Sequence, residues 1–230
     1  MPLGVLINCL SVFLGAVLGA ALSSRITDDL QEKLPVLFGF CAMGIGVHSI
    51  VKASSMAAVV MAVILGYCLG NAIRLEARVH RFLGRLLARL CDSSSEEKLS
   101  MLVTFATICC FSGFGWYGAL TESLSGSPDI LISKSVLDFF TAVLFAAVIG
   151  KTVCFLPVGQ IAVMMIVFFA GKFIAPYISA EAFLDMSACG GLLTFATGLR
   201  ISKIKPFPIL DFAPALILVC PISQLLSMLL

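Results

Sequence analysis

Two ionisable residues lie one helical turn apart in an otherwise apolar stretch, and they are the strongest functional signal in the chain. Lys134 and Asp138 stand within residues 130–149, where the other side chains are apolar or small hydroxyls. Their four-residue spacing places both on one face of a helix. Charged groups at membrane depth cost at least about 2.5 kcal/mol each, so they normally face a protein interior or wet cavity and mark an ion or substrate path. The pair therefore predicts a functional segment.

Glycines crowd the segment just before this pair. Gly113, Gly115 and Gly118 precede Glu122, and Asp129 follows in a Ser-Gly-Ser-Pro-Asp turn. Glycine at this density lets a helix unwind, and the freed backbone carbonyls or amides can replace the hydration of an ion. The alternative is a helix end followed by an extracellular turn, with the glycines used for close packing.

The sequence predicts one polar site built around the two embedded carboxylates. The candidate ion- or substrate-binding residues are Asn8, Gly113, Gly115, Gly118, Glu122, Asp129, Lys134, Asp138 and Thr197. Glu122 and Asp138 would bind a cation or proton, and Lys134 would balance or gate them. In the alternative, Lys134 and Asp138 form a structural pair in a non-transporting scaffold subunit, and Asn8 is only an interhelical hydrogen-bond partner.

The composition requires these residues to lie in a membrane. Hydrophobic residues make up 60% of the 230, charged residues make up 12%, and the mean hydropathy is +1.10, whereas soluble domains are far more polar. Apolar runs of about twenty residues, enough to span a bilayer, recur from end to end. The predicted fold class is an all-α integral membrane protein with about eight transmembrane helices, over residues 4–24, 34–51, 56–73, 100–119, 131–153, 157–178, 183–199 and 209–228.

Basic residues set the expected orientation, because loops rich in Lys and Arg stay in the cytoplasm. Eight alternating spans place twelve of the fifteen Lys and Arg residues on one side. These twelve are Arg25, Lys33, Arg74, Arg78, Arg81, Arg85, Arg89, Lys98, Lys151, Arg200, Lys203 and Lys205. We therefore expect both the N- and C-termini on the outer side of the membrane.

A shift of 152 positions aligns the first three predicted helices with the last three. It superposes Gly19 on Gly171, Gly39 on Gly191, Gly46 on Gly198 and Cys68 on Cys220, and it sets Asn8 against Gln160. The first triplet begins outside and the second inside, as an inverted repeat demands. The expected organisation is a first repeat (1–76), a central Gly-rich helical hairpin (100–154) and a second repeat (157–230). Two similar apolar hairpins without common origin are the alternative.

Residues 77–99 are predicted to form a cytoplasmic amphipathic segment between the first repeat and the hairpin. Apolar residues such as Val79, Leu83 and Leu87 follow one helical stripe, and basic residues such as Arg78 and Arg81 follow the other. This pattern is typical of a helix lying in the membrane interface. We do not expect nucleic-acid binding.

No motif supports catalysis, so we expect neither enzyme activity nor a cofactor or metal site. The sequence has no His-Glu-x-x-His motif, nucleophile elbow, phosphate-binding Gly-Lys loop or Cys-His cluster. Most of the nine Cys lie inside apolar segments, where we interpret them as small buried residues. Intramembrane proteolysis by paired aspartates is disfavoured, because Asp138 has only Glu122 or Asp129 as a plausible partner.

Several of these positions carry a resemblance to a known family. They are Gly4 and Asn8 with Gly15 and Gly19, Gly118 and Glu122 through Gly126 and Asp129, Lys134-Ser-x-Leu-Asp138, Gly190-Gly191, and Thr197-Gly198-Leu-Arg200. Over nearly its full length the chain resembles the YdfK/YqgA-like bacterial inner-membrane proteins, a domain-of-unknown-function family. Members typically have a Gly-Asp-Pro-type turn where this chain has Gly126-Ser-Pro-Asp129. The resemblance implies a polytopic membrane protein and supplies no substrate.

The predicted function is a small membrane transporter or channel for an ion or small solute. The expected partners are the lipid bilayer, the transported species and further copies of the same chain. Gly15-x-x-x-Gly19 and the many small residues favour the close helix contacts that oligomers use, but they could equally pack within one chain.

Overall fold

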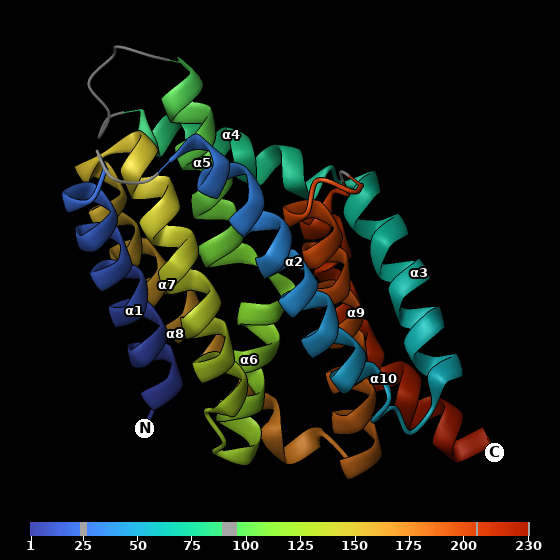
Figure 1. Cartoon of the computed structure of the whole chain (residues 1–230). Coiled ribbons are helices and arrows are strands. Elements are labelled where there is room, and N and C mark those ends of the chain that lie inside the picture. Colours follow the sequence, from blue (N-terminus) through green and yellow to red (C-terminus); the bar gives the residue numbers. More distant parts are fainter. Residues whose placement is uncertain (24–26, 89–95, 206, 230) are drawn as a thin grey trace.

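The described residues of this chain, 1–23, 27–88, 96–205 and 207–229 of a computed structural model, are helical and contain no strand. The helices run side by side across the molecule (Figure 1). They are α1 (Leu3–Ala21), α2 (Asp28–Ile50), α3 (Met56–Ala72), α4 (Leu75–Leu87), α5 (Glu96–Phe111), α6 (Gly113–Ser125), α7 (Asp129–Ile149), α8 (Leu156–Ile174), α9 (Ala180–Ile201) and α10 (Pro214–Leu229), with short 3-10 helices η1 (Lys151–Phe155), η2 (Ala175–Tyr177) and η3 (Ile209–Phe212). Arg25 and Arg89 of the predicted basic set lie outside the described residues.

Each predicted span corresponds to one helix, or to α5 and α6 together. By length and composition, seven helical stretches within the described ranges can cross a membrane, and the bent pair α3–α4 brings the number to eight. Phe173 and Ile217 are 79% and 75% exposed, as lipid-facing side chains must be. Both chain ends lie at the end of the bundle opposite α4 (Figure 1), which requires an even number of crossings. The prediction of an all-α membrane protein with about eight spans is confirmed.

Local sequence explains where many helices begin and end. Thr27, Ser55, Ser112 and Ser179 cap α2, α3, α6 and α9, each accepting a backbone N–H three residues onward. At the other end, Gly126 follows α6 with a φ of 78° and Gly150 follows α7 with a φ of 98°. Glycine adopts this left-handed conformation without a Cβ clash, so both helices can stop sharply.

The first half of the predicted amphipathic segment, residues 77–87, lies in α4, which bends away from α3 by 52°. Residues 89–95 of the predicted segment lie outside the described residues, and residues 96–99 begin α5. Leu83 and Leu87 are buried and pack in one cluster with residues of α5, while Phe82 and Leu86 are exposed. Arg78, Arg81 and Arg85 are also exposed. The helix therefore covers one end of the bundle with its apolar stripe, as the sequence pattern predicts for an interfacial helix.

The fourth span is interrupted near its middle. Phe111 ends α5, Ser112 is extended, and Gly113 begins α6, yet residues 96–125 continue as one membrane-length stretch. Trp116 Nε1 donates to the Cys110 carbonyl oxygen at 3.0 Å, so the side chain partly replaces the lost helical hydrogen bonds. The glycine-rich segment thus crosses the bundle with a break in it, and it does not turn back.

Helices α2 and α9 cross at four glycines. A Cβ on Gly39 would lie 2.6 Å from the Gly198 carbonyl oxygen, and one on Gly191 would lie 2.7 Å from that of Gly46. The two backbones therefore touch, as small residues permit. The two contacts correspond to each other under the offset of 152, which takes Gly39 to Gly191 and Gly46 to Gly198. Exchanging the two helices therefore turns the Gly39–Gly198 contact into the Gly191–Gly46 contact, as a local two-fold relation between α2 and α9 would.

The Gly15-x-x-x-Gly19 face of α1 is used inside the chain. A Cβ on Gly15 would clash with the backbone of Phe139, and a Cβ on Gly19 would clash with that of Val143, both in α7. Of the two uses the sequence left open for this motif, the structure has the intramolecular one. The motif therefore gives no support to contact between copies of the chain.

Candidate functional site

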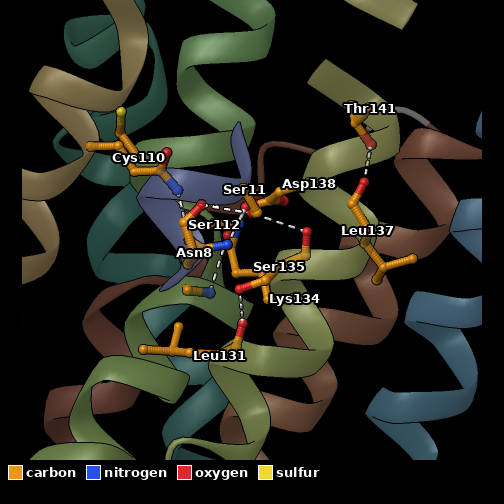
Figure 2. A network of polar contacts seen from close by, with 12 residues as sticks. Asn8, Ser11, Cys110, Ser112, Leu131, Lys134, Ser135, Leu137, Asp138 and Thr141 are labelled. Atoms are coloured by element: carbon orange, nitrogen blue, oxygen red, sulfur yellow. Dashed lines mark hydrogen bonds and ion pairs between the residues drawn. The ribbon is translucent and has the colours of Figure 1, made fainter. Parts of the chain in front are cut away.

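Four buried polar side chains from three helices form one network. Lys134 of α7 pairs with Oδ2 of Asp138 on the same helix. Asn8 of α1 donates through Nδ2 to that same oxygen at 2.9 Å, and Gln160 of α8 donates through Nε2 to Asn8 Oδ1 at 2.7 Å. Figure 2 shows Asn8, Lys134 and Asp138 together where α1 meets α7. The network thus joins the central hairpin to both of its flanking segments.

The network is almost completely removed from solvent. Asn8 and Gln160 have no exposed surface, and Lys134 and Asp138 are 2% and 5% exposed. Moving each ion of such a pair out of water costs several kcal/mol, and apolar residues of the same volume are often as stable or more so. Asn8 offsets part of this cost by donating to the carboxylate. Stability alone therefore does not account for the pair.

Gln160 has a polar atom that the protein leaves unpaired. Its Oε1 is one of three buried side-chain polar atoms without a hydrogen-bond partner within the described part of the chain. The orientation of the amide is fixed, because turning it over would set Oε1 against Asn8 Oδ1, and two acceptors cannot share a hydrogen bond. Buried polar atoms are nearly always paired, so an exception suggests a partner supplied from elsewhere.

The break between α5 and α6 lies beside the ion pair. A Cβ on Gly115 would lie 3.0 Å from Lys134 Cε and 3.2 Å from Ser112 Oγ. Ser112 Oγ itself accepts the Gly115 N–H at 3.1 Å, and Ser112 lies close to the network in Figure 2. Gly115 is thus the predicted glycine that contacts the network, and it leaves room there for the lysine side chain.

Glu122, which the sequence proposed as a ligand for a cation or proton, is buried, and its carboxylate contacts the backbone at the start of α1. It lies on α6, and its carboxylate accepts the Gly4 N–H at 2.7 Å and the Val5 N–H at 3.3 Å. These amides open α1, where a negative charge also meets the positive end of the helix dipole. In the structure Glu122 therefore caps α1, one helical turn from Asn8.

The remaining predicted site residues lie away from the ion pair. Asp129 is exposed and accepts a hydrogen bond from Ser127 Oγ at 2.7 Å at the start of α7. Gly113 packs against Leu193, and Gly118 packs against Leu131. These contacts match the packing alternative for the two glycines.

Thr197 also lies apart from the network. It is buried on α9 and donates to the Leu193 carbonyl oxygen at 2.8 Å. It lines a small cavity together with Ser112, so it lies near the helix break.

Sequence reasoning did not include Gln160 or Ser112 among the site residues. The offset of 152 had already set Gln160 against Asn8, and that pairing was the signal that could have added it. Ser112 stands at the head of the glycine run, where an N-cap serine is a recognisable start of a new helix. Ser11, whose Oγ donates to the Ser135 carbonyl oxygen at 3.0 Å, had no comparable signal.

The chemistry at the site is that of one carboxylate, one ammonium and two amides. No group of three or more His, Cys, Asp or Glu side chains in the described ranges could hold a metal ion. The site can therefore exchange a proton or a weakly held cation at the carboxylate, or bind a polar solute group at the amides.

The fold and the buried network together define a polytopic helical membrane protein with an internal polar site. The chain belongs to the family described as "Protein of unknown function (DUF554)", whose model matches residues 3–224. It is 37% identical over 227 residues to the uncharacterized protein YqgA of Escherichia coli (strain K12), covering 97% of each chain. It is 22% identical over 219 residues to the uncharacterized membrane protein YdfK of Bacillus subtilis (strain 168), covering 94% of this chain and 93% of YdfK. These relatives confirm the family resemblance read from the sequence. No solved structure matches the chain significantly.

Proposed function

We propose that the protein is a small membrane transporter or channel for an ion or small solute, in which Asp138 binds a cation or proton. The observation that carries the proposal is the buried network of Asn8, Lys134, Asp138 and Gln160, with its one unpaired amide oxygen. Ionisable residues inside membrane bundles are costly and mark ion or proton paths.

The helix break next to the network supports the same proposal. Transporters commonly bind substrate and coupling ions where interrupted helices expose backbone groups between two repeats. Here α5 and α6 meet at Ser112 beside Lys134, between the segments that carry Asn8 and Gln160. A bound species could reach both the polar side chains and the ends of the two half-helices.

Thermal unfolding of the purified chain in detergent tests the proposal. The unfolding midpoint would be measured across alkali cations and across pH for the wild type, Asp138→Asn and the exposed control Asp129→Asn. We expect a cation- or pH-specific rise that Asp138→Asn removes and Asp129→Asn keeps, because a ligand stabilises the state that it binds. Asparagine can still accept the hydrogen bond from Asn8, but it leaves Lys134 buried without a counter-charge, so the double variant Lys134→Met/Asp138→Asn is measured beside it as the folded form that lacks the carboxylate.

The alternative is a scaffold subunit, favoured by the internal pairing of Lys134 with Asp138. A wild-type midpoint that no cation and no pH change shifts specifically would favour this reading over transport. An equal shift in the wild type and in Asp138→Asn would place the bound species elsewhere in the protein.

We further propose that the protein lies in the bacterial inner membrane with α4 on the cytoplasmic side and both termini outside. The support is the basic character of the α4 end together with the position of both termini at the opposite end. A C-terminal alkaline phosphatase fusion should be active and a C-terminal fluorescent-protein fusion dark. The reverse result would overturn the orientation.

A further inference from the structure

A cavity of about 360 Å³ lies among α2, α5, α7 and α9, and none of the four network residues lines it. Its walls are mainly apolar, with Phe38, Ile108, Leu144 and Phe145 among the lining residues. The volume falls in the range of about 300–1,000 Å³ that is typical of small-molecule sites. The cavity is therefore large enough for a small organic molecule.

Two cations lie at one end of this cavity. Arg200 and Lys203 line it, and no Asp or Glu of the described chain does. Arg200 is fixed near α4, since its Nη1 donates to Glu76 Oε1 at 2.7 Å and to the Phe207 carbonyl oxygen at 3.2 Å. Lys203 is exposed and has no carboxylate within ion-pair distance in the described ranges. This end complements an anionic group.

The threonines in the cavity wall do not offer their hydroxyl protons to a ligand. Thr104 Oγ1 donates to the Ser100 carbonyl oxygen at 2.9 Å, and Thr141 Oγ1 donates to the Leu137 carbonyl oxygen at 2.7 Å. Both protons are thus used within the helices. Away from its cationic end, the cavity suits an apolar molecular body.

A much smaller cavity adjoins the first one on the side of the helix break. Its volume is about 10 Å³, it shares Ile108 and Arg200 with the larger cavity, and Ser112 and Thr197 also line it. Ser112 stands at the helix break, and Gly115 lies between it and Lys134. The larger cavity is thus separated from the ion pair by the residues around Ser112.

Tyr117 fills the place on α9 to which the offset takes part of the cavity wall. The offset of 152 takes Pro35 and Phe38, which line the cavity on α2, to Ser187 and Gly190 on α9. There Tyr117 of α6 hydrogen-bonds through its hydroxyl to Ser187, and a Cβ on Gly190 would lie 2.5 Å from its ring. The space that remains on that side is a smaller cavity of about 190 Å³, lined by Phe183 among others.

From these observations we infer that the cavity binds a small organic anion with an apolar body, which enters at Arg200 and Lys203. The inference rests on the proposed transport function and names its substrate class. The anion lies in the cavity, Asp138 carries the coupling cation or proton, and the two charges cross together. On the opposite side, Tyr117 packs against Gly190 and hydrogen-bonds to Ser187 and so fills the related place on α9.

Equilibrium binding of radiolabelled benzoate to the purified full-length chain in a nonionic detergent tests the inference. We expect saturable binding, with little competition from benzylammonium or benzamide, which match its shape without the negative charge. Lys203→Gln should weaken binding about fivefold, as expected for one partly exposed charge. Thr141→Trp should abolish binding, because indole fills the cavity. The matched control Lys172→Gln, an exposed lysine on α8, should bind as the wild type does.

The absence of saturable benzoate binding would overturn the inference. So would competition by benzylammonium equal to that by unlabelled benzoate. Wild-type benzoate affinity in both Lys203→Gln and a folded Thr141→Trp would overturn it as well. Displacement of benzoate by phosphatidylglycerol but not by soluble carboxylates would assign the cavity to lipid and also overturn it. If benzoate fails to bind while the Asp138-dependent cation or pH response persists, the substrate class is wrong and the transport proposal stands. Loss of both responses counts against transport itself.

Discussion

Asn8 and Gln160 are separated by 152 residues and hydrogen-bond to each other at 2.7 Å, with no exposed surface on either. The same offset exchanges the glycine contacts of α2 and α9. It also takes Asn8 of α1 to Gln160 of α8, so two residues that the offset relates are in direct contact. The ion pair of Lys134 and Asp138, bonded to Asn8, lies beside this contact.

The Asn8–Gln160 contact should be energetically coupled. In a double-mutant cycle, Asn8→Leu and Gln160→Leu should interact by about 0.6 kcal/mol and by no more than about 2 kcal/mol, the range for hydrogen bonds inside membrane bundles. Denaturant unfolding in mixed micelles measures each corner of the cycle. As a control, Asn8→Leu combined with Gln224→Leu should be additive within about 0.5 kcal/mol, because Gln224 is a half-buried glutamine of α10 that hydrogen-bonds to Tyr177 and not to the network. Equal coupling in both cycles would contradict the contact.

Removing one partner of the buried ion pair should cost far more than removing both. Lys134→Met leaves the Asp138 carboxylate buried and unpaired, so the free energy of unfolding should fall by about 3–5 kcal/mol, and adding Asp138→Leu should restore most of it. Lys33→Met is the matched control, because Lys33 and Asp29 form an i,i+4 pair whose side chains are 73% and 67% exposed. Its cost should stay below about 1 kcal/mol. Similar losses for both lysines would contradict the buried pairing.

Glu122 should behave as a helix cap. Glu122→Ala removes the acceptor for the Gly4 and Val5 amides and should lower stability by about 1 kcal/mol, while Glu122→Gln, which keeps an acceptor, should cost less. Thermal unfolding of both variants beside Glu181→Ala, an exposed acid at the start of α9, makes the comparison. If Glu122→Gln instead abolished a cation response at unchanged stability, Glu122 would be the ion ligand that the sequence predicted.

Glycine should be required on α2 only where it meets α9. Gly39→Ala places a methyl group against the Gly198 backbone and should destabilise the protein or part the two helices. Gly44→Ala, on the same helix but with open space at its Cβ position, should be neutral or stabilising by about 1 kcal/mol. Unfolding midpoints of the two variants decide the point, and a harmless Gly39→Ala would refute the close crossing.

Protein stability should decline in mild acid because of His80 on α4. Burial lowers the pKa of its imidazole below the usual 6.5, with Glu76 opposing the shift and Arg200 adding to it. The unfolded chain then binds the proton more readily, so His80 contributes stability above about pH 6.5 that is lost as pH falls through the folded-state pKa. Unfolding between about pH 5 and about pH 8 should have a shallower pH slope in His80→Gln.

Hydropathy was sufficient to predict the number and approximate bounds of the spans, because transfer of apolar side chains into lipid depends on local composition. The spacing of Lys134 and Asp138 predicted that they share one face, since residues four apart do so in any helix. The amphipathic pattern of α4 could likewise be read from periodicity. The offset aligned Asn8 with Gln160 but did not predict that the two side chains touch.

The contacts between helices became known from the three-dimensional structure. Glu122 caps α1 by accepting the N–H of Val5, a residue 117 positions away in the sequence. Gly15 packs against α7 of the same chain. Gln160 completes the network, while Asp129 stays at an exposed turn. Hydropathy and spacing act over a few turns of helix, whereas these contacts depend on side-chain packing between segments remote in sequence. The same residue types could have paired otherwise, and packing selects among the possibilities.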